Sequence, residues 1–251
     1  MMRHLKITLL ILVCNSCIAI SPKEKGGAKP ISHDQWTELL QKYVDGNKVD
    51  YKGFIQDSVK LNEYLNLLET NHPNQENWTK IEQLAYWINA YNAFTIRVVI
   101  RNHPLSSIRD IAGAIPLINS VWDIKFIRIG EETYGLNNIE HGILRSQFRE
   151  PRIHFAINCT SVSCPTLRNE AYVADKLEAQ LQEQTILFLK DESKNQIDFD
   201  KLELSKIFRW FGGDFEKGEN SKEDFIKEQL GIELSNEVKL EYREYDWSLN
   251  E

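Results

Sequence analysis

The segment from Lys80 to Arg101 is the part of the sequence that most strongly predicts its own secondary structure. Thr79 and Glu82 have the spacing of a capping box, in which two side chains satisfy backbone N–H groups at the start of a helix. The helical pattern continues up to His103 and Pro104, and the residue before a proline disfavours helical geometry. The segment therefore predicts one long helix that ends just before the proline.

This helix is expected to have two different faces. The apolar face contains Ile81, Leu84, Ile88, Tyr91, Thr95 and Val99, and the other contains Tyr86, Ala90, Ala93, Arg97 and Arg101. Asn89 and Asn92 are amides beside or within the apolar side, where an unpaired amide costs about 1–3 kcal/mol, so each needs a partner. Two interpretations stay open: both amides bond to neighbouring loop backbone and fix the fold, or one orients a substrate or a catalytic group.

The composition describes a chain with a substantial core. Of the 251 residues, 42% are hydrophobic and 27% are charged, which excludes disordered, collagen-like and coiled-coil proteins. The net charge is −7 and the sequence has no dense basic run, which argues against nucleic-acid binding. We expect a single mixed α+β domain, rich in helix, with a small and mainly antiparallel sheet.

The N-terminal segment is typical of an exported protein. A basic head with Arg3 and Lys6 precedes the apolar run from Ile7 to Val13, so residues 1–21 are predicted to be a signal peptide. The run is shorter than the roughly 20 residues that span a bilayer, and we expect no membrane span. Cys17 is a candidate lipid anchor, although Cys14 and Asn15 stand where lipoprotein signals usually carry Leu and a small residue. The expected location is the periplasm or the cell surface.

Residues 22–31 are rich in Gly, Lys and Pro and are predicted to be a flexible tether, so ordered structure is expected from Ser32. Residues 32–75 form a predicted N-terminal helical segment. Its first helix is expected to begin at a capping box of Ser32 and Gln35, and its second is expected over residues 58–69.

After the long helix the pattern predicts a short helix at 106–114 and a hairpin of 121–129 with 133–136. Asn137 and Glu140 are expected to cap a helix over 139–147, which places His141 in its first turn. The positive end of a helix dipole favours a neutral imidazole, which suits a catalytic base, a metal ligand or an ordinary core histidine.

Residues 153–157 alternate with a period of two and predict a strand that leads into a polar loop, residues 158–165. Four interpretations of the loop stay open. Cys159 and Cys164 form a disulfide, which export favours. Cys164 or Cys159 is a nucleophile, with His141 or His154 as base and Glu140, Asn92 or Asn158 as orienting group. The two thiols and two histidines bind zinc, for which the spacing is weak. Finally, both thiols are buried and inert. The spacing is not Cys-x-x-Cys, which argues against disulfide redox chemistry of the thioredoxin type.

The C-terminal part, residues 191–251, is expected to pack on the core as an extension. A helix is predicted at 174–190 and another at 204–211, with a third beginning at Ser221; strands are predicted at 196–200 and 238–242. The sequence contains no internal repeat, no Gly-rich phosphate loop and no Gly-x-Ser-x-Gly elbow.

Five motifs together resemble the domain-of-unknown-function 547 family. They are YWINAYNAFTI at 86–96, HPLSSIRDI at 103–111, LNNIEHGILR at 136–145, EPRIHFAINCTSVSCPTLR at 150–168 and DWSLN at 246–250. The resemblance covers residues 78–189 well, with a family core expected over 76–190, and it implies no assigned chemistry. In eukaryotic members of the family the loop keeps its serines and proline while the cysteine positions vary. The resemblance therefore implies that Ser161, Ser163, Pro165 and Arg168 shape the loop.

These observations favour an exported binding or interaction domain whose cleft lies between the long helix and the loop at 159–165. Its ligand is expected to be a peptide or a small molecule, with no cofactor and no bound metal. The ligand-binding candidates are Asn89, Asn158, Ser161, Ser163 and Arg168. The alternative is a thiol-dependent hydrolase or acyl transferase, whose catalytic candidates are Cys164, His141, His154, Glu140 and Asn92.

Overall fold

The structure is a computed structural model that describes residues 27–114, 120–216 and 220–251. The expected signal peptide and Cys17 lie outside these residues, as do residues 22–26 of the expected tether. Among the described helices, none combines the length and the apolar character that crossing a bilayer requires.

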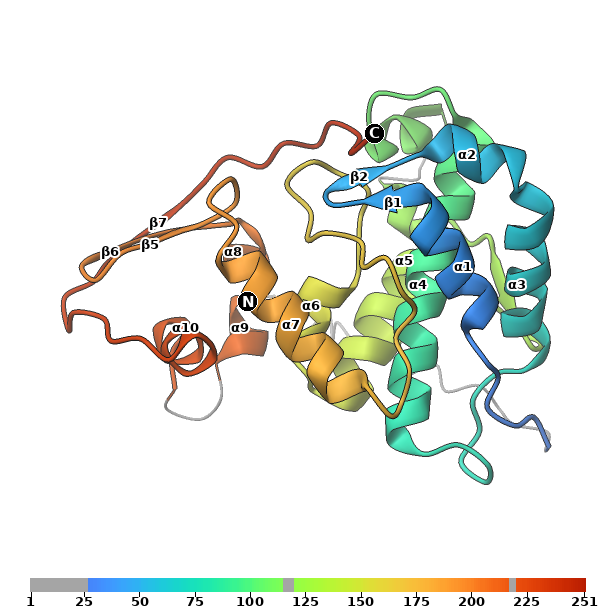
Figure 1. Cartoon of the computed structure of the whole chain (residues 1–251), viewed down its shortest axis with the longest axis horizontal. Helices are drawn as coiled ribbons and strands as arrows, with labels where there is room; N and C mark the ends of the chain where they lie inside the picture. The colour runs from blue at the N-terminus through green and yellow to red at the C-terminus, as the bar shows by residue number, and fades with distance from the viewer. Residues whose placement is uncertain (1–26, 115–119, 217–219) are drawn as a thin grey trace, which may run out of the picture.

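Helices make up most of the regular structure (Figure 1). The α-helices are α1 (Asp34–Tyr43), α2 (Tyr51–Gln56), α3 (Ser58–Thr70), α4 (Lys80–Asn102), α5 (Leu136–Ile139), α6 (Ile153–Ala156), α7 (Leu177–Leu189), α8 (Ile207–Trp210), α9 (Gly212–Phe215) and α10 (Lys222–Leu230). Two 3-10 helices are η1 (Ile108–Ala114) and η2 (Val121–Asp123), and η3 (Glu140–Phe148) is a π-helix.

The strands form three small sheets. β1 (Val44–Asp45) pairs with β2 (Lys48–Val49), and β3 (Ile127–Ile129) pairs with β4 (Glu132–Tyr134), both antiparallel. The third sheet has the order β5 (Gln196–Ile197), β6 (Lys201–Leu204) and β7 (Lys239–Tyr242); its first pair is antiparallel and its second is parallel. The predicted class, a helix-rich α+β domain with mainly antiparallel pairing, is confirmed.

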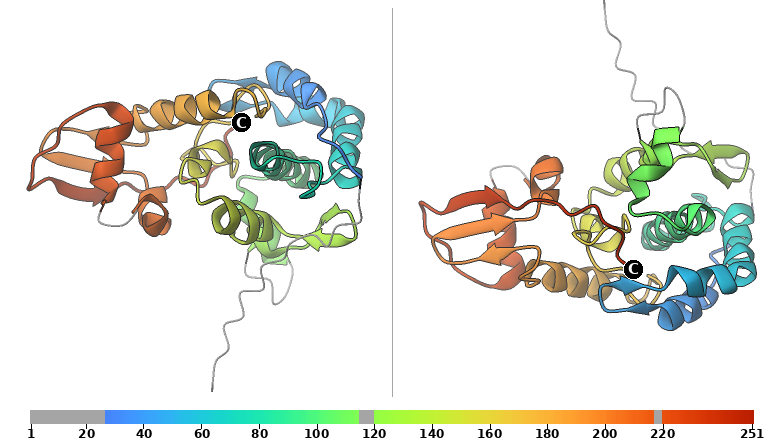
Figure 2. Two further views of the ribbon diagram at one scale, coloured as in Figure 1. Left: turned by 90° about the horizontal axis from the view of Figure 1, so that it is seen from below. Right: turned by 90° about the horizontal axis from the view of Figure 1, so that it is seen from above.

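Helix α4 is the central element of the larger part of the fold. The capping box of Thr79 and Glu82 is present, and the helix ends before His103 as predicted. Figure 2 shows α4 nearly end-on, enclosed by the helices of the larger part of the fold and by the β3–β4 hairpin. The expectation of two contrasting faces is wrong in the middle of the helix, because Tyr86 and Ala90 of the expected polar face are buried as well. At the start of the helix, Ile81 of the expected apolar face is 53% exposed. A helix enclosed on every side buries both of its faces.

The N-terminal helices differ from the prediction at their start. His33, rather than Ser32, is the N-cap of α1. Its side chain makes no cap bond, because the ring turns inward and lies 2.7 Å from the hydroxyl of Tyr64. Ser32 Oγ accepts a hydrogen bond from the backbone N–H of Asp34 (3.1 Å), and the predicted capping box with Gln35 does not form. Ordered structure also begins before Ser32. The carbonyl of Ala28 accepts hydrogen bonds from Asn74 (2.8 Å) and from the indole of Trp78 (2.9 Å).

Three further predictions are corrected. Residues 153–156 form the short helix α6 rather than a strand, since all four side chains are buried and the alternation does not separate two faces. Gly135 and Asn138 cap α5, so His141 lies beyond the first helical turn. Residues 201–204 belong to strand β6, and the helix predicted over 204–211 is reduced to α8.

A second, smaller core lies under the C-terminal sheet and helices, with Phe155 of α6 packed against Phe188, Phe208 and Phe215. After β7 the chain returns across the molecule to the larger part, where it ends near β2 (Figure 1). The backbone of Asn250 bonds there to Val49 (2.9 Å) and Thr160 (3.0 Å). The last residues therefore connect the two parts.

Candidate functional site

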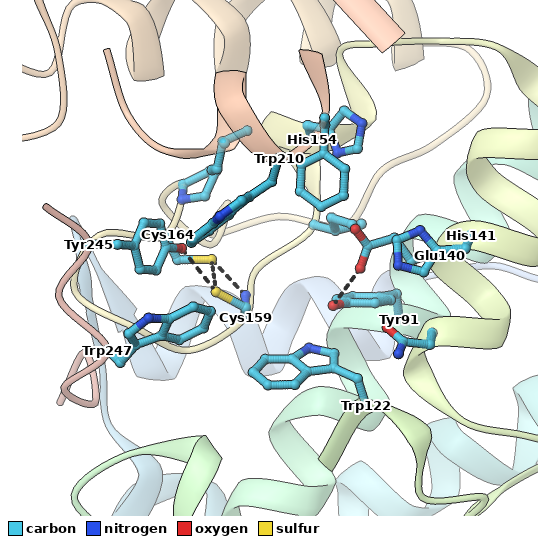
Figure 3. A pocket seen from close by; sticks show the side chains of 15 residues that line it. Tyr91, Trp122, Glu140, His141, His154, Cys159, Cys164, Trp210, Tyr245 and Trp247 are labelled. Carbon is cyan, nitrogen blue, oxygen red and sulfur yellow. Dashed lines mark hydrogen bonds between the residues drawn. The ribbon is translucent and has the colours of Figure 1, made fainter. Parts of the chain in front are cut away.

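A pocket opens where the returning C-terminal segment passes the loop at 158–165 (Figure 3). It holds about 630 Å³ of space between its walls, part of it open to solvent. Six of the fifteen residues that line it are aromatic: Tyr91, Trp122, Trp210, Phe211, Tyr245 and Trp247. A concave site with apolar walls and a few polar groups is the usual form of a small-molecule site.

The indoles form one continuous wall. The ring centroid of Trp247 lies 5.7 Å from that of Trp122, 5.7 Å from that of Trp210 and 4.6 Å from that of Tyr245. Trp210 is 45% exposed although it belongs to a packed aromatic group. A large exposed apolar surface at a cavity is typical of a binding site.

Two sulfurs lie against this wall. The Sγ atoms of Cys159 and Cys164 are 2.6 Å apart, and both residues are free thiols in the structure. Cys159 is half-buried, whereas Cys164 is only 4% exposed and its Sγ accepts a hydrogen bond from the Cys159 backbone N–H (2.7 Å). The predicted disulfide stays a prediction, and the pair is already close enough to form it.

Two hydroxyl groups lie within hydrogen-bond distance of the Cys159 sulfur. The Oγ of Ser161 lies 3.2 Å and the Oη of Tyr245 lies 3.3 Å from the Cys159 Sγ. Burial by itself raises the pKa of the Cys159 thiol, but its hydrogen bonds with Cys164, Ser161 and Tyr245 lower that pKa to about 6. Burial and the neighbouring sulfur raise the pKa of Cys164. Cys159, rather than Cys164, is therefore the thiol suited to nucleophilic chemistry.

Glu140 supplies a carboxyl group on the other side of the pocket (Figure 3). It is buried at the start of the π-helix η3, a form of helix often found at functional sites. Its Oε2 accepts a hydrogen bond from the Tyr91 hydroxyl (3.3 Å). Burial, with a contribution from the charge on Cys159, raises the pKa of Glu140 to about 7. A carboxyl with this pKa can give or take a proton near neutral pH.

His154 has a partner, Asp214, that the sequence does not predict. Its Nε2 donates a hydrogen bond to the carboxylate of Asp214 (2.7 Å), and its ring stacks on Phe211 with centroids 4.1 Å apart. Burial lowers the pKa of His154 despite the adjacent carboxylate. The ring is thus a core histidine that donates one hydrogen bond, and it joins α6 to α9.

His141 lines the pocket but is held by an arginine. Its Nδ1 lies 2.8 Å from Arg145, which can only donate, so Nδ1 accepts and the imidazole is neutral. Burial and the charge of Arg145 lower the pKa of His141. The neutral imidazole therefore has these causes, and not the helix dipole that the sequence suggested. Arg145 also pairs with Asp214. Among the described residues, neither His141 nor His154 forms a hydrogen bond with a sulfur.

The three asparagines organise backbone. The Asn89 amide pairs with the backbone of Tyr172 through both its atoms (2.7 and 3.0 Å). Asn92 donates to the carbonyl of Ala156 (3.0 Å) and accepts from the N–H of Asn158 (2.9 Å). The side chain of Asn158 in turn bonds to Pro165 (2.6 Å) and Thr160 (2.8 Å). The interpretation in which Asn89 and Asn92 fix the fold agrees with these bonds, and none of the three lines the pocket.

The other loop candidates differ in position. Ser161 contacts the Cys159 sulfur, as described above. Ser163 Oγ accepts from the backbone N–H of Asp246 (2.9 Å) and so attaches the loop to the C-terminal segment. Arg168 forms ion pairs with Glu170 (2.5 Å) and Glu183 (2.7 Å) outside the pocket. Within the described part of the chain, no group of three or more His, Cys, Asp and Glu residues is arranged to hold a metal ion, so the zinc interpretation is wrong for these ligands.

Residues 75–189 match a family model described as protein of unknown function, DUF547. The chain carries a DUF547 domain. No curated protein and no solved structure matches the chain. The DUF547 segment supplies the thiols, Glu140 and His141, together with Tyr91 and Trp122 of the wall.

The remainder of the wall lies outside the DUF547 segment. These four residues come from the C-terminal extension, which the sequence predicts only to pack on the core: Trp210, Phe211, Tyr245 and Trp247. Two signals in the sequence point to this tail: the motif DWSLN at 246–250, and the density of aromatic residues in Tyr245-Asp246-Trp247. The pocket thus exists only where the DUF547 domain and the extension meet.

Proposed function

We propose that this protein is an exported binding domain of the cell envelope whose aromatic pocket holds an apolar or aromatic group of a small molecule or peptide. The export part rests on the basic head and apolar run at residues 1–21. Mass measurement of the mature N-terminus tests it: loss of residues 1–21 supports export, a lipid-modified Cys17 supports export with an anchor, and retention of Met1 in the native host argues against both.

The binding part rests on one observation, the continuous wall of Trp122, Trp210 and Trp247 around a solvent-accessible hollow. Indole rings offer large apolar faces that lose little conformational freedom when a ligand stacks on them. Arg109 lies over the Trp247 ring (5.2 Å to the centroid), which fixes this ring from outside. A ring that is already held costs less to order on binding.

A fluorescence titration with the neutral probe N-phenyl-1-naphthylamine tests this proposal. We expect saturable binding, weakened by about fivefold in Trp247→Ala because one aromatic contact contributes about 1 kcal/mol. Phe199→Ala is the matched control, since it removes an aromatic ring that is 65% exposed and does not line the pocket. Equal losses in both variants, or no saturable binding to the unmodified protein, would contradict the proposal.

A thiol-dependent hydrolase or acyl transferase is the second candidate, and the observation in its favour is Cys159 with its hydroxyl neighbours. The nucleophile would then be Cys159 rather than Cys164, with Glu140 in place of an imidazole as the proton acceptor. With 4-nitrophenyl acetate, this enzyme would release nitrophenolate in a burst and carry an acetyl group on Cys159. Absence of both in the folded protein excludes this candidate.

A further inference from the structure

The loop at 158–165 brings its two sulfurs together in spite of their separation in sequence. Thr160 has a left-handed backbone (φ 67°), and the N–H of Cys164 bonds to the carbonyl of Ser161 (3.0 Å). This turn folds the loop back, so that the Sγ atoms approach to 2.6 Å. The absence of Cys-x-x-Cys spacing therefore does not prevent a functional thiol pair.

The two thiols are unequal in a way that suits sequential reaction. Cys159 is half-buried at the pocket wall, and the hydroxyls of Ser161 and Tyr245 face its sulfur. Cys164 is 4% exposed and lies in direct contact with Cys159. A reagent in the pocket meets Cys159, and Cys164 is placed to attack whatever forms there.

We propose that Cys159 and Cys164 are a redox-active dithiol that reduces a small-molecule disulfide bound in the aromatic pocket. This goes beyond ligand binding and rests on the proposed function only in that the pocket must admit the disulfide. The hydroxyl groups beside the Cys159 sulfur stabilise its thiolate. A purely structural disulfide contains no thiolate and would not need them.

The reaction has two exchange steps. The Cys159 thiolate attacks one sulfur of the ligand, the ligand S–S bond breaks, and the first half leaves as a thiolate while the other half is joined to Cys159. Cys164 then loses its proton and attacks the Cys159 sulfur, which releases the second half and leaves a Cys159–Cys164 disulfide. Two electrons pass from the dithiol to the ligand, and the two thiol protons end on the two released thiols.

The test uses the full chain with Cys14→Ser and Cys17→Ser, so that only this pair reports, and the aromatic disulfide 4,4′-dithiodipyridine. We expect the reduced protein to release two thiopyridones and to end two hydrogens lighter, with no adduct. Cys164→Ser is expected to release one thiopyridone and keep the other half on Cys159. Cys159→Ser is expected to react at least about tenfold more slowly, since its remaining thiol is buried.

Three results would overturn the proposal: a stable adduct on Cys159 when Cys164 is present, a Cys159→Ser variant that reacts as fast as the parent, or no reaction of the reduced parent. Cys164→Ala repeats the test if Cys164→Ser does not fold, as judged by thermal unfolding. Saturable binding of N-phenyl-1-naphthylamine without thiopyridone release would leave the binding function standing and reject only the redox activity.

Discussion

The hydroxyl of Tyr245 lies 3.3 Å from the Sγ of Cys159, although the tyrosine belongs to the C-terminal extension and the cysteine to the DUF547 domain. Close to this contact, the backbone of Val162 bonds to Ser248 (2.8 Å) and that of Ser163 to Asp246 (3.2 Å). The extension thus holds the loop and also supplies a donor to its reactive sulfur.

Alkylation of Cys159 should have an unusual pH profile. Because the thiolate is the reactive form and the pKa of Cys159 is about 6, its labelling by iodoacetamide should rise about tenfold from pH 5 to pH 7 and then level off. Cys164 should stay unlabelled in the folded protein. Mass spectrometry of peptides after timed labelling gives both rates. A Cys159 rate that keeps rising to pH 9 would show an ordinary thiol.

Tyr245→Phe should shift this profile. The variant keeps the ring that packs on Trp247 and removes the hydroxyl, so the Cys159 thiolate loses a donor and its pKa should rise by about one unit. Tyr242→Phe is the matched control, because its hydroxyl faces Lys222 in the distal sheet. An unchanged labelling midpoint in Tyr245→Phe, or the same shift in both variants, would contradict the assigned contact.

Glu140 should make the protein less stable as the pH rises. Burial raises the pKa of Glu140 to about 7 in the folded protein, against 4.5 in the unfolded chain. The stabilising contribution of the neutral carboxyl to the folded state is therefore fully present below pH 4.5 and is lost as the pH rises through 7. From pH 5 to pH 8, Glu140→Gln should gain about 3 kcal/mol relative to the wild type in urea unfolding. Glu63→Gln, an exposed change on α3, should show no such gain. A constant difference between Glu140→Gln and wild type would refute the buried acid.

Asn92→Ala should destabilise the fold by about 2 kcal/mol or more, because it leaves the carbonyl of Ala156 and the N–H of Asn158 without their partner inside the protein. Asn66→Ala removes an exposed amide from helix α3 and should change the unfolding free energy by less than about 0.5 kcal/mol. Denaturant unfolding of both variants tests this. Similar stability of the two would mean that the Asn92 bonds contribute nothing.

Sequence patterns predict the local structure correctly where all the residues involved are close together in the chain. The capping boxes of Thr79 with Glu82 and of Ser221 with Asp224 involve residues three apart, and both are present. The hairpin around Gly130 also forms, over Ile127–Ile129 and Glu132–Tyr134, since Gly130 has the positive φ (59°) that the turn between the strands needs. The first part of the predicted strand, Val121–Asp123, is instead the 3-10 helix η2. Such features depend only on neighbouring residues.

Features that depend on distant partners were missed. The alternation at 153–157 predicts a strand, but residues 153–156 form helix α6. All four of these side chains are buried, His154 included, so the alternation of polar and apolar residues does not mark an exposed and a buried face. Asp214 gives no local sign that it will pair with His154 and Arg145. The thiols and Glu140 can be recognised as candidates from the sequence. The pocket around them cannot, because the indoles of Trp210 and Trp247 that complete its wall come from the C-terminal extension.

The most direct test of the central claim is protection of Cys159 by a ligand in the pocket. N-phenyl-1-naphthylamine at about ten times its Kd should slow iodoacetamide labelling of Cys159 by about tenfold. This protection should fall to about threefold in Trp247→Ala at the same probe concentration, because the aromatic wall and the thiol form one site. Labelling of Cys159 at an unchanged rate while the probe is bound would show that the wall and the thiol are separate, and would contradict the account.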